Sequence, residues 1–326
     1  MKMEFNGAET GLGIVNNDND IGLMGKTQEY SFEEILFCEM CGAPTVKHRI
    51  LGQRLNQSQG LKPWKKEGIS VSVKKCSNCQ LIYSSPLPKP KNIHDHYGLS
   101  PEGYWKGETL SWSSSYFADQ IVKAKELLQY TEGRLALDIG AGTGKGMMSM
   151  MNAGFDTYGL EPSKPFYTRI LEQMHIDPSH LRMGMVEDVN YPDNHFDFIN
   201  YGAVVEHLYH PAYCIEKALR WLKPGGVMHI EVPSSKHLIA KLLNFYYKLV
   251  GTNYVTHLSP MHSPFHLYEF GIKSFAELSR KLGCSIASHH IFVGSIEYIP
   301  GPLKPLFRKY MEATDTGMQL VVWLRK

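Results

Sequence analysis

A glycine-rich loop near the middle of the chain carries the residues best suited to holding a cofactor. Residues 135–146 read Leu-Ala-Leu-Asp-Ile-Gly-Ala-Gly-Thr-Gly-Lys-Gly, so Gly140, Gly142 and Gly144 follow an apolar strand and precede a helix. Backbone at such a turn passes close to a ligand at the helix N-terminus. The dinucleotide pattern requires a glycine three residues after Gly142, where Lys145 stands. The loop therefore departs from the pattern that binds NAD.

An acid two residues before the first glycine indicates the charge of the ligand. Asp138 would repel a pyrophosphate but attract a ligand that carries an ammonium and a sulfonium group. The loop, including Ala141, therefore predicts S-adenosylmethionine rather than NAD. Glu161 ends the next strand, nineteen residues after Gly142, where a carboxylate can accept both ribose hydroxyls. A turn without a ligand would need only one glycine.

Four cysteines have the spacing of a metal site. Cys38-x-x-Cys41 and Cys76-x-x-Cys79 are two pairs separated by 34 residues. Four thiolates can surround one tetrahedral Zn²⁺ ion and leave no position open for chemistry, so we expect a structural zinc site. A disulfide is the weaker interpretation for a cytosolic protein. Because the gap exceeds the commonest finger spacing, unrelated thiols are the alternative.

The composition indicates a globular protein with unevenly distributed charge. The chain has 326 residues, of which 43% are hydrophobic, enough for a large domain and a small one. The formal net charge is only +2, yet residues 42–92 carry ten lysines and arginines against one acid, Glu67. Three interpretations of this basic stretch are open: it recognises an anionic diphosphate substrate, it contacts nucleic acid, or it forms a solvated surface. The polar start and the absence of an apolar run of roughly 20 residues predict a cytoplasmic protein with no transmembrane segment.

Strand and helix patterns alternate through the second half of the chain. This alternation predicts a doubly wound α/β sheet of seven strands with helices on both faces. We expect a flexible leader over residues 1–30, a zinc ribbon over 31–92 and a domain over 93–326, with a substrate lid inserted at about 233–270. The expected strands are 135–139, 157–160, 181–186, 196–201, 227–232, 285–293 and 318–324, and the expected helices are 113–130, 145–152, 164–175, 212–222 and 273–282.

These motifs in combination resemble those of the class I S-adenosylmethionine-dependent methyltransferases. The likeness runs from Leu135 through Val232, with continuation to Lys326, and includes residues 137–144, 159–163, 201–207 and 222–226. It implies a Rossmann-like sheet and S-adenosylmethionine as the methyl donor. The cysteine-containing ribbon ahead of this domain is similar to a subgroup of small-molecule methyltransferases that act on sugar nucleotides, polysaccharide precursors or secondary metabolites.

The resemblance also implies which residues meet the rest of the cofactor. Residues 186–189, followed by 193–197, are similar to the stretch where an acid meets the adenine amino group. This implies Asp188 for that role, with Val189 beside it. Tyr201 begins the next matching motif and is also expected to line the cofactor site.

Methyl transfer is an in-line displacement, so the protein must align the acceptor and, where required, remove its proton. His207 follows the fourth strand at the edge where α/β sheets bind ligands. In the inserted segment, His262, His266 and Tyr268 are further candidates, and residues 266–268 look most like the family's loop. Some relatives use an acid at the position of Ala203 to bind a divalent ion. No catalytic metal is therefore expected here.

We predict an enzyme that transfers a methyl group to a carbon or oxygen of a small, anionic metabolite. One alternative is an RNA base methyltransferase whose basic ribbon grips the nucleic acid. A second alternative is a protein that binds S-adenosylmethionine without turnover. An apolar helical stripe at 238–250 is interpreted as core or lid packing, with a membrane surface or a dimer partner as the alternatives.

Overall fold

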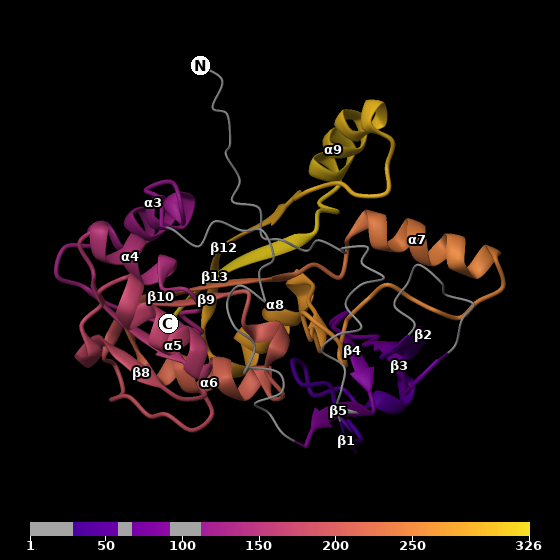
Figure 1. Ribbon diagram of the computed structural model, residues 1–326, viewed down its shortest axis with the longest axis horizontal. Coiled ribbons are helices and arrows are strands. Elements are labelled where there is room, and N and C mark those ends of the chain that lie inside the picture. The colour runs from indigo at the N-terminus through magenta and orange to yellow at the C-terminus, as the bar shows by residue number, and fades with distance from the viewer. Residues whose placement is uncertain (1–28, 58–66, 92–111) are drawn as a thin grey trace.

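A seven-stranded sheet forms the centre of the molecule in the computed structural model, which describes residues 29–57, 67–91 and 112–326 (Figure 1). The strand order is β12-β13-β10-β9-β6-β7-β8, and β13 runs antiparallel to both neighbours while the other pairs are parallel. The doubly wound α/β prediction is confirmed. The strands are β6 (Leu135–Ile139), β7 (Asp156–Glu161), β8 (Leu181–Met183), β9 (Phe196–Gly202), β10 (Leu222–Pro233), β12 (Ser285–Phe292) and β13 (Gln319–Arg325).

Helices cover both faces of this sheet because successive side chains of a strand point to opposite sides. Ala136 and Phe198 pack towards α3 (Ala118–Leu128) and α4 (Lys145–Asn152), and α5 (Lys164–Gln173) packs beside α4. Leu137 and Ile199 point to the other face, which is covered by α6 (Pro211–Trp221) and α8 (Ile272–Leu282). Four of these five helices begin within a residue of their expected start; α3 begins five residues later.

The N-terminal part of the chain forms short antiparallel strands at the side of the main sheet (Figure 1). β1 (Tyr30–Glu33) pairs with β5 (Leu87–Pro90), while β2 (Arg49–Leu55), β3 (Ser70–Lys75) and β4 (Ile82–Ser85) make a second sheet. The expected leader lies almost wholly outside the described residues. We call the described residues 29–57 and 67–91 the N-terminal module.

The inserted segment completes the second sheet. Its strand β11 (Tyr268–Glu269) pairs antiparallel with β4, so the sheet order is β11-β4-β3-β2. Gln53 also forms a parallel bridge with Tyr254. The segment expected as a lid is therefore anchored to the N-terminal module by backbone hydrogen bonds.

One hydrophobic core joins the two regions. The cysteine-bearing loops, with Met40 and Leu81, lie in the same cluster as Ile199 of the main sheet and Phe275 of α8. The Ser274 hydroxyl of α8 donates a hydrogen bond to the Cys79 carbonyl at 3.1 Å. The N-terminal module is thus packed onto the domain rather than tethered beside it.

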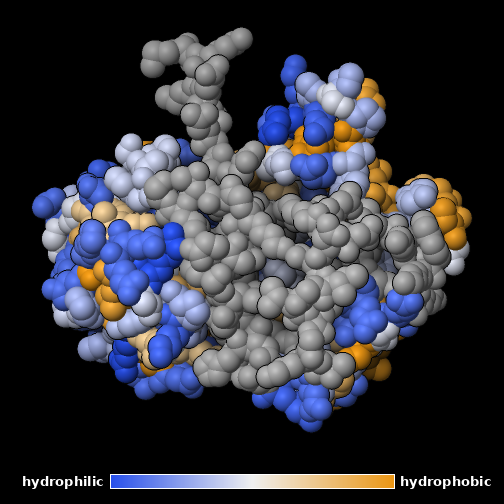
Figure 2. Space-filling model, in the orientation of Figure 1, coloured by the Kyte–Doolittle hydropathy of each residue, from blue (hydrophilic) through white to orange (hydrophobic). Residues whose placement is uncertain are grey.

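Two helices carry exposed apolar side chains. α7 (Leu238–Leu249) buries Ile239 and Tyr247 but exposes Phe245 and Leu249, and α9 (Lys304–Ala313) exposes Leu306. Figure 2 shows hydrophobic residues gathered over these helices. The stripe at 238–250 is therefore only partly used for packing. No helix in the described part of the chain is long and apolar enough to cross a bilayer.

Candidate active site

Three glycines shape the loop between β6 and α4. Gly140, Gly142 and Gly144 all have positive φ angles, of 71°, 55° and 81°. A Cβ atom on Gly140 would lie 2.5 Å from a methyl carbon of Val204. The loop after β6 therefore packs directly against the loop after β9, and Ala141 is buried beneath it. Positive φ angles favour glycine at all three positions, and Gly140 is also needed for this close approach.

Asp138 lies behind the loop, in a buried hydrogen-bonded network. Asn200 Nδ2 donates to Asp138 Oδ1 at 2.6 Å, and Asn200 Oδ1 lies 2.7 Å from His229 Nδ1. A Cβ on Gly146 would lie 2.6 Å from Asp138 Oδ2, so only glycine leaves room for the carboxylate beside the first turn of α4. Burial raises the pKa of Asp138 to about 6. The network fixes this carboxylate at the start of the loop.

Glu161 lies at the carboxyl end of β7 and faces the same loop. Its two oxygens accept hydrogen bonds from the backbone N–H groups of Gly142, at 2.7 Å, and Ser163, at 2.8 Å. Burial raises the pKa of Glu161 to about 7. Each carboxylate oxygen can accept a second hydrogen bond. The residue therefore fits the role of binding ribose hydroxyls.

The other expected cofactor residues differ in exposure. Asp188 is exposed in the turn after β8, and Val189 is buried beside it. Tyr201, in contrast, points into the core, where its hydroxyl donates to the Cys214 carbonyl at 3.1 Å. We expected the Tyr201 side chain to line the cofactor. It points instead towards α6, because successive side chains of a strand point to opposite faces of the sheet.

A carboxylate and two imidazoles meet beside the glycine loop. Glu206 and His207 lie in the short turn η4 (Val205–His207) after β9, and His266 reaches them from the inserted segment. Glu206 Oε1 lies 3.8 Å from His266 Nε2, and the rings of His207 and His266 are 4.9 Å apart. The Leu267 N–H donates to the Glu206 carbonyl at 2.8 Å, which holds the two segments together. We call Glu206, His207 and His266 the Glu-His-His cluster.

Burial controls the charge of this cluster. Glu206 is 1% exposed, and its Oε2 has no hydrogen-bond partner among the described residues. Burial raises the pKa of Glu206 to about 8 and lowers the pKa of His207 to about 4. Burial, with smaller effects of His207 and His262, holds the pKa of His266 well below its usual value. Both imidazoles are therefore neutral near pH 7 and have a lone pair available.

Comparisons with known proteins bear on the central domain of the chain. A family model described as a methyltransferase domain matches residues 137–230. The demethylmenaquinone methyltransferase of Bacillus licheniformis is 26% identical over 190 residues, which cover 53% of this chain and 80% of the relative. A ubiquinone biosynthesis O-methyltransferase of Alkalilimnicola ehrlichii is 26% identical over 187 residues, covering 52% and 70%. The chain contains an S-adenosylmethionine-dependent methyltransferase domain.

A solved structure was also found to be similar. The S-adenosylmethionine-dependent methyltransferase of Mesorhizobium loti is 13% identical, with a TM-score of 0.46, and the match covers 67% of this chain and 100% of that chain. Two further curated relatives are covered over only 48% and 49% of their own length.

The remaining candidates for acceptor chemistry lie on the inserted segment. His262 is near His266, and burial, followed by the charge of Arg54, lowers the pKa of His262 to about 3. Tyr268 was expected to contact the acceptor, but it is fully buried and its hydroxyl donates to the Tyr209 carbonyl at 3.0 Å. Tyr268 therefore supports the junction between β11 and the methyltransferase domain.

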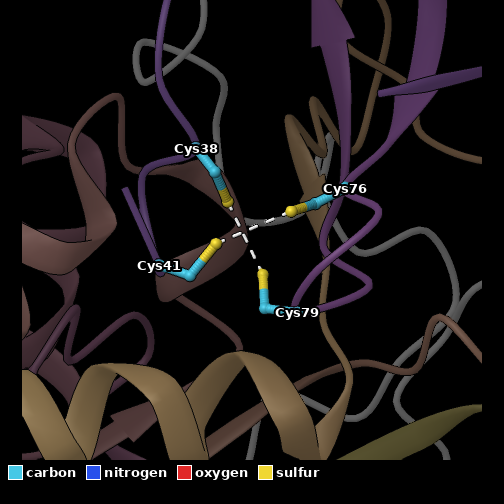
Figure 3. Close-up of side chains that lie close together, drawn as sticks. All are labelled: Cys38, Cys41, Cys76 and Cys79. Atoms are coloured by element: carbon cyan, nitrogen blue, oxygen red, sulfur yellow. Dashed lines mark hydrogen bonds between the residues drawn. The ribbon is translucent and has the colours of Figure 1, made fainter. Parts of the chain in front are cut away.

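The four spaced cysteines converge on one point, as Figure 3 shows. The Sγ atoms of Cys38 and Cys79 are 3.5 Å apart, and those of Cys41 and Cys76 are 3.6 Å apart. A disulfide would need about 2.05 Å, whereas a tetrahedral ion with bonds of about 2.3 Å separates its sulfurs by about 3.8 Å. The four thiols therefore fit a Zn²⁺ ion.

Some of these residues were not identified from the sequence. Asn200 and His229 lie within apolar strands, and a polar residue flanked by buried hydrophobic ones was the available signal. Glu206 was not singled out, because its nearness to His266 depends on where the inserted segment folds. The donor atoms of the Glu-His-His cluster lie within 4.8 Å of one another and could also hold a metal ion, so the expectation of no catalytic metal, which rested on Ala203, stays a prediction.

Proposed function

We propose that the chain transfers a methyl group from S-adenosylmethionine to a carbon or oxygen of a small, anionic metabolite. The observation that carries this proposal is the position of the Glu-His-His cluster. Gly140 of the cofactor loop contacts Val204, which precedes Glu206 by two residues. The cluster therefore lies next to the loop that would hold the donor. The printed names of the two relatives, which concern quinone biosynthesis, also favour a small-molecule acceptor.

His266 is proposed as the general base. S-adenosylmethionine supplies an activated methyl group, so the chain's own task is to align the acceptor and take its proton. Neutral His266 can accept that proton, and Glu206, whose pKa is raised to about 8, would stabilise the resulting imidazolium only after losing its own proton. The ring of His207 packs against that of His266, and His207 Nδ1 lies 3.3 Å from the Phe265 carbonyl oxygen. His207 is therefore proposed to position His266.

The cysteine site is proposed to bind structural Zn²⁺. Cys38 and Cys41 follow β1, and Cys76 and Cys79 join β3 to β4. An ion there would hold together the module that carries β4, the strand to which the inserted segment is paired. The zinc would thus support the acceptor side of the site without taking part in chemistry.

Direct turnover is the test of the proposed function. Nucleotide sugars, phenolic metabolites and total RNA would be incubated with the full chain and labelled S-adenosylmethionine, with formation of S-adenosylhomocysteine as the readout. With an active acceptor, His266→Ala should lower kcat about a hundredfold or more, and binding of S-adenosylmethionine should persist. Exposed His289→Ala is the matched control. Absence of donor binding, or full activity of His266→Ala, would overturn the corresponding part of the proposal.

The RNA alternative has less support from the described basic residues. Arg49 is exposed on β2, whereas Arg54 on the same strand is buried, so these charges do not form one open surface. Lys62, Lys65 and Lys66 lie outside the described residues. An RNA methyltransferase predicts steeply salt-dependent RNA binding in the same screen. A protein without turnover predicts donor binding and no product with any acceptor.

A further inference from the structure

A buried arginine stands where the N-terminal module meets the inserted segment. Arg54 lies on β2 and is 8% exposed. Its Nη1 donates to the Tyr254 hydroxyl and, at 3.2 Å, to the Val255 carbonyl. The guanidinium carbon lies 5.0 Å from the centre of the Tyr254 ring. One end of the guanidinium is therefore fixed by the inserted segment.

The other edge of the guanidinium lacks an anionic partner in the described part of the chain. Nε is buried without a hydrogen-bond acceptor, and neither Nε nor Nη2 meets a carboxylate among the described residues. By contrast, the partly buried Arg134 donates to Asp197 at 2.8 Å. Burial lowers the pKa of Arg54 and the charge of Glu269 partly offsets this shift, but Glu269 Oε2 already lies 2.5 Å from His257 Nδ1. Burying a cation without a counter-charge costs free energy, so an anion bound at this edge would stabilise the protein.

Arg54 contacts the inserted segment, which also carries His262 and His266 of the proposed acceptor side. The charge of Arg54 acts on His262, and His262 acts in turn on His266. His262 Nε2 is also buried without a partner among the residues that the structure describes. Ser259 fixes the position of His266 by two hydrogen bonds of 3.0 Å. The Ser259 N–H donates to the His266 carbonyl, and the Ser259 hydroxyl accepts from the His266 N–H.

We infer that Arg54 binds an oxyanion of the acceptor, a phosphoryl or carboxylate group, through its Nε and Nη2 edge. Two parallel N–H donors match two oxygens of such a group and fix its orientation. Tyr247 and Tyr254 pack with Leu55, the residue next to Arg54 on β2. The anion would hold the acceptor at one end while His266 meets the atom to be methylated. This inference rests on the proposed function and narrows its substrate class.

The test compares wild type with Arg54→Met in the full chain. Inorganic pyrophosphate, inorganic phosphate and malonate are titrated by calorimetry, which separates a preference for phosphoryl groups from one for carboxylates. We expect wild type to bind at least one of these anions and Arg54→Met to bind it at least tenfold more weakly. Arg49→Met, an exposed arginine of the same strand, should bind like wild type.

Thermal unfolding without anion separates a binding role from a structural one. Arg54→Met keeps an unbranched side chain and removes the unpaired charge, so its melting temperature should equal or exceed that of wild type. If Arg54→Met does not fold, Arg54→Lys keeps the charge without the two-donor edge and should still weaken anion binding at least threefold.

Two results would overturn the inference: no anion binding by wild type, or equal binding by wild type and the Arg54 variants. Titration with S-adenosylhomocysteine on the same samples distinguishes failure of the Arg54 site from failure of the proposed methyl transfer. Binding of this nucleoside without anion binding would reject the Arg54 site and leave the proposed methyl transfer intact. Loss of nucleoside binding in wild type would reject the proposed function itself.

Discussion

The two halves of the candidate site are built in different ways. The donor side uses residues from consecutive elements of one sheet: Asp138 on β6, Glu161 at the end of β7 and Asn200 on β9. The acceptor side joins residues far apart in the chain, since Arg54 and His266 come from the N-terminal module and the inserted segment. With the roles proposed above, a shared domain would supply donor binding while a separate assembly of segments would determine the acceptor.

Removing a zinc ligand should have the largest effect, and it should impair the acceptor side while leaving donor binding intact. Cys76→Ser is expected to destabilise the chain by several kcal/mol, because a structural zinc site contributes directly to folding. Below the lowered melting temperature, turnover should fall at least tenfold while the affinity for S-adenosylmethionine stays within threefold of wild type. Calorimetry, zinc content and thermal unfolding check this. Cys284→Ser, outside the cluster, is the control, and an equal loss of donor affinity in Cys76→Ser would contradict the separation.

A substitution in the glycine loop should have the opposite pattern. Gly140→Ala places a Cβ 2.5 Å from the Val204 side chain at a φ of 71°, so the loop must shift. We expect at least a tenfold loss of S-adenosylmethionine affinity. Gly133→Ala, at a φ of 67° with open space around its Cβ, should cost about 1 kcal/mol of stability and leave that affinity unchanged. Unchanged binding by Gly140→Ala would show that the loop does not hold the donor.

The donor side should also depend on pH through Glu161. Its pKa is raised from 4.5 to about 7 in the fold, so donor binding that needs the carboxylate should weaken up to tenfold per unit below pH 7. Between about pH 4.5 and 7 the folded chain binds more protons than the unfolded chain at this group. The stability contribution of Glu161 therefore falls as pH rises through that window.

Glu161→Gln isolates both effects. Its donor affinity should be weak and flat with pH, and its stability relative to wild type should rise from pH 5 to pH 8. Calorimetry and chemical denaturation across this range measure the two quantities. The same pH dependence in wild type and Glu161→Gln would assign the titration to another group, such as Asp138, whose pKa is raised to about 6 by burial.

The smallest effect is expected at Tyr268. Tyr268→Phe removes the hydroxyl that donates to the Tyr209 carbonyl, which should cost about 1 kcal/mol of stability. Turnover should stay within threefold of wild type, because the side chain supports the junction and is buried away from solvent. Tyr310→Phe, exposed on α9, is the control. A hundredfold loss of kcat in Tyr268→Phe would place this residue in the chemistry.

The sequence predicted the donor side better than the acceptor side for a physical reason. Strand periodicity and the glycine spacing are local signals, so all seven strands of the main sheet and the loop at Gly140 followed from them. The approach of Glu206 to His266 and the burial of Arg54 depend on contacts between distant segments. Tyr201 and Tyr268 were assigned by motif position, which does not specify the face of a strand to which a side chain points.

The pairing of β11 with β4 has a consequence for how such enzymes can be recombined. A chimera that exchanges only the cysteine-bearing module would leave the edge of its sheet facing a foreign partner strand and would lose the register that places His266. Exchange of the module together with residues 253–270 would carry both members of the pair. With the roles proposed above, the residues that select the acceptor would therefore be encoded by two separate stretches of the gene.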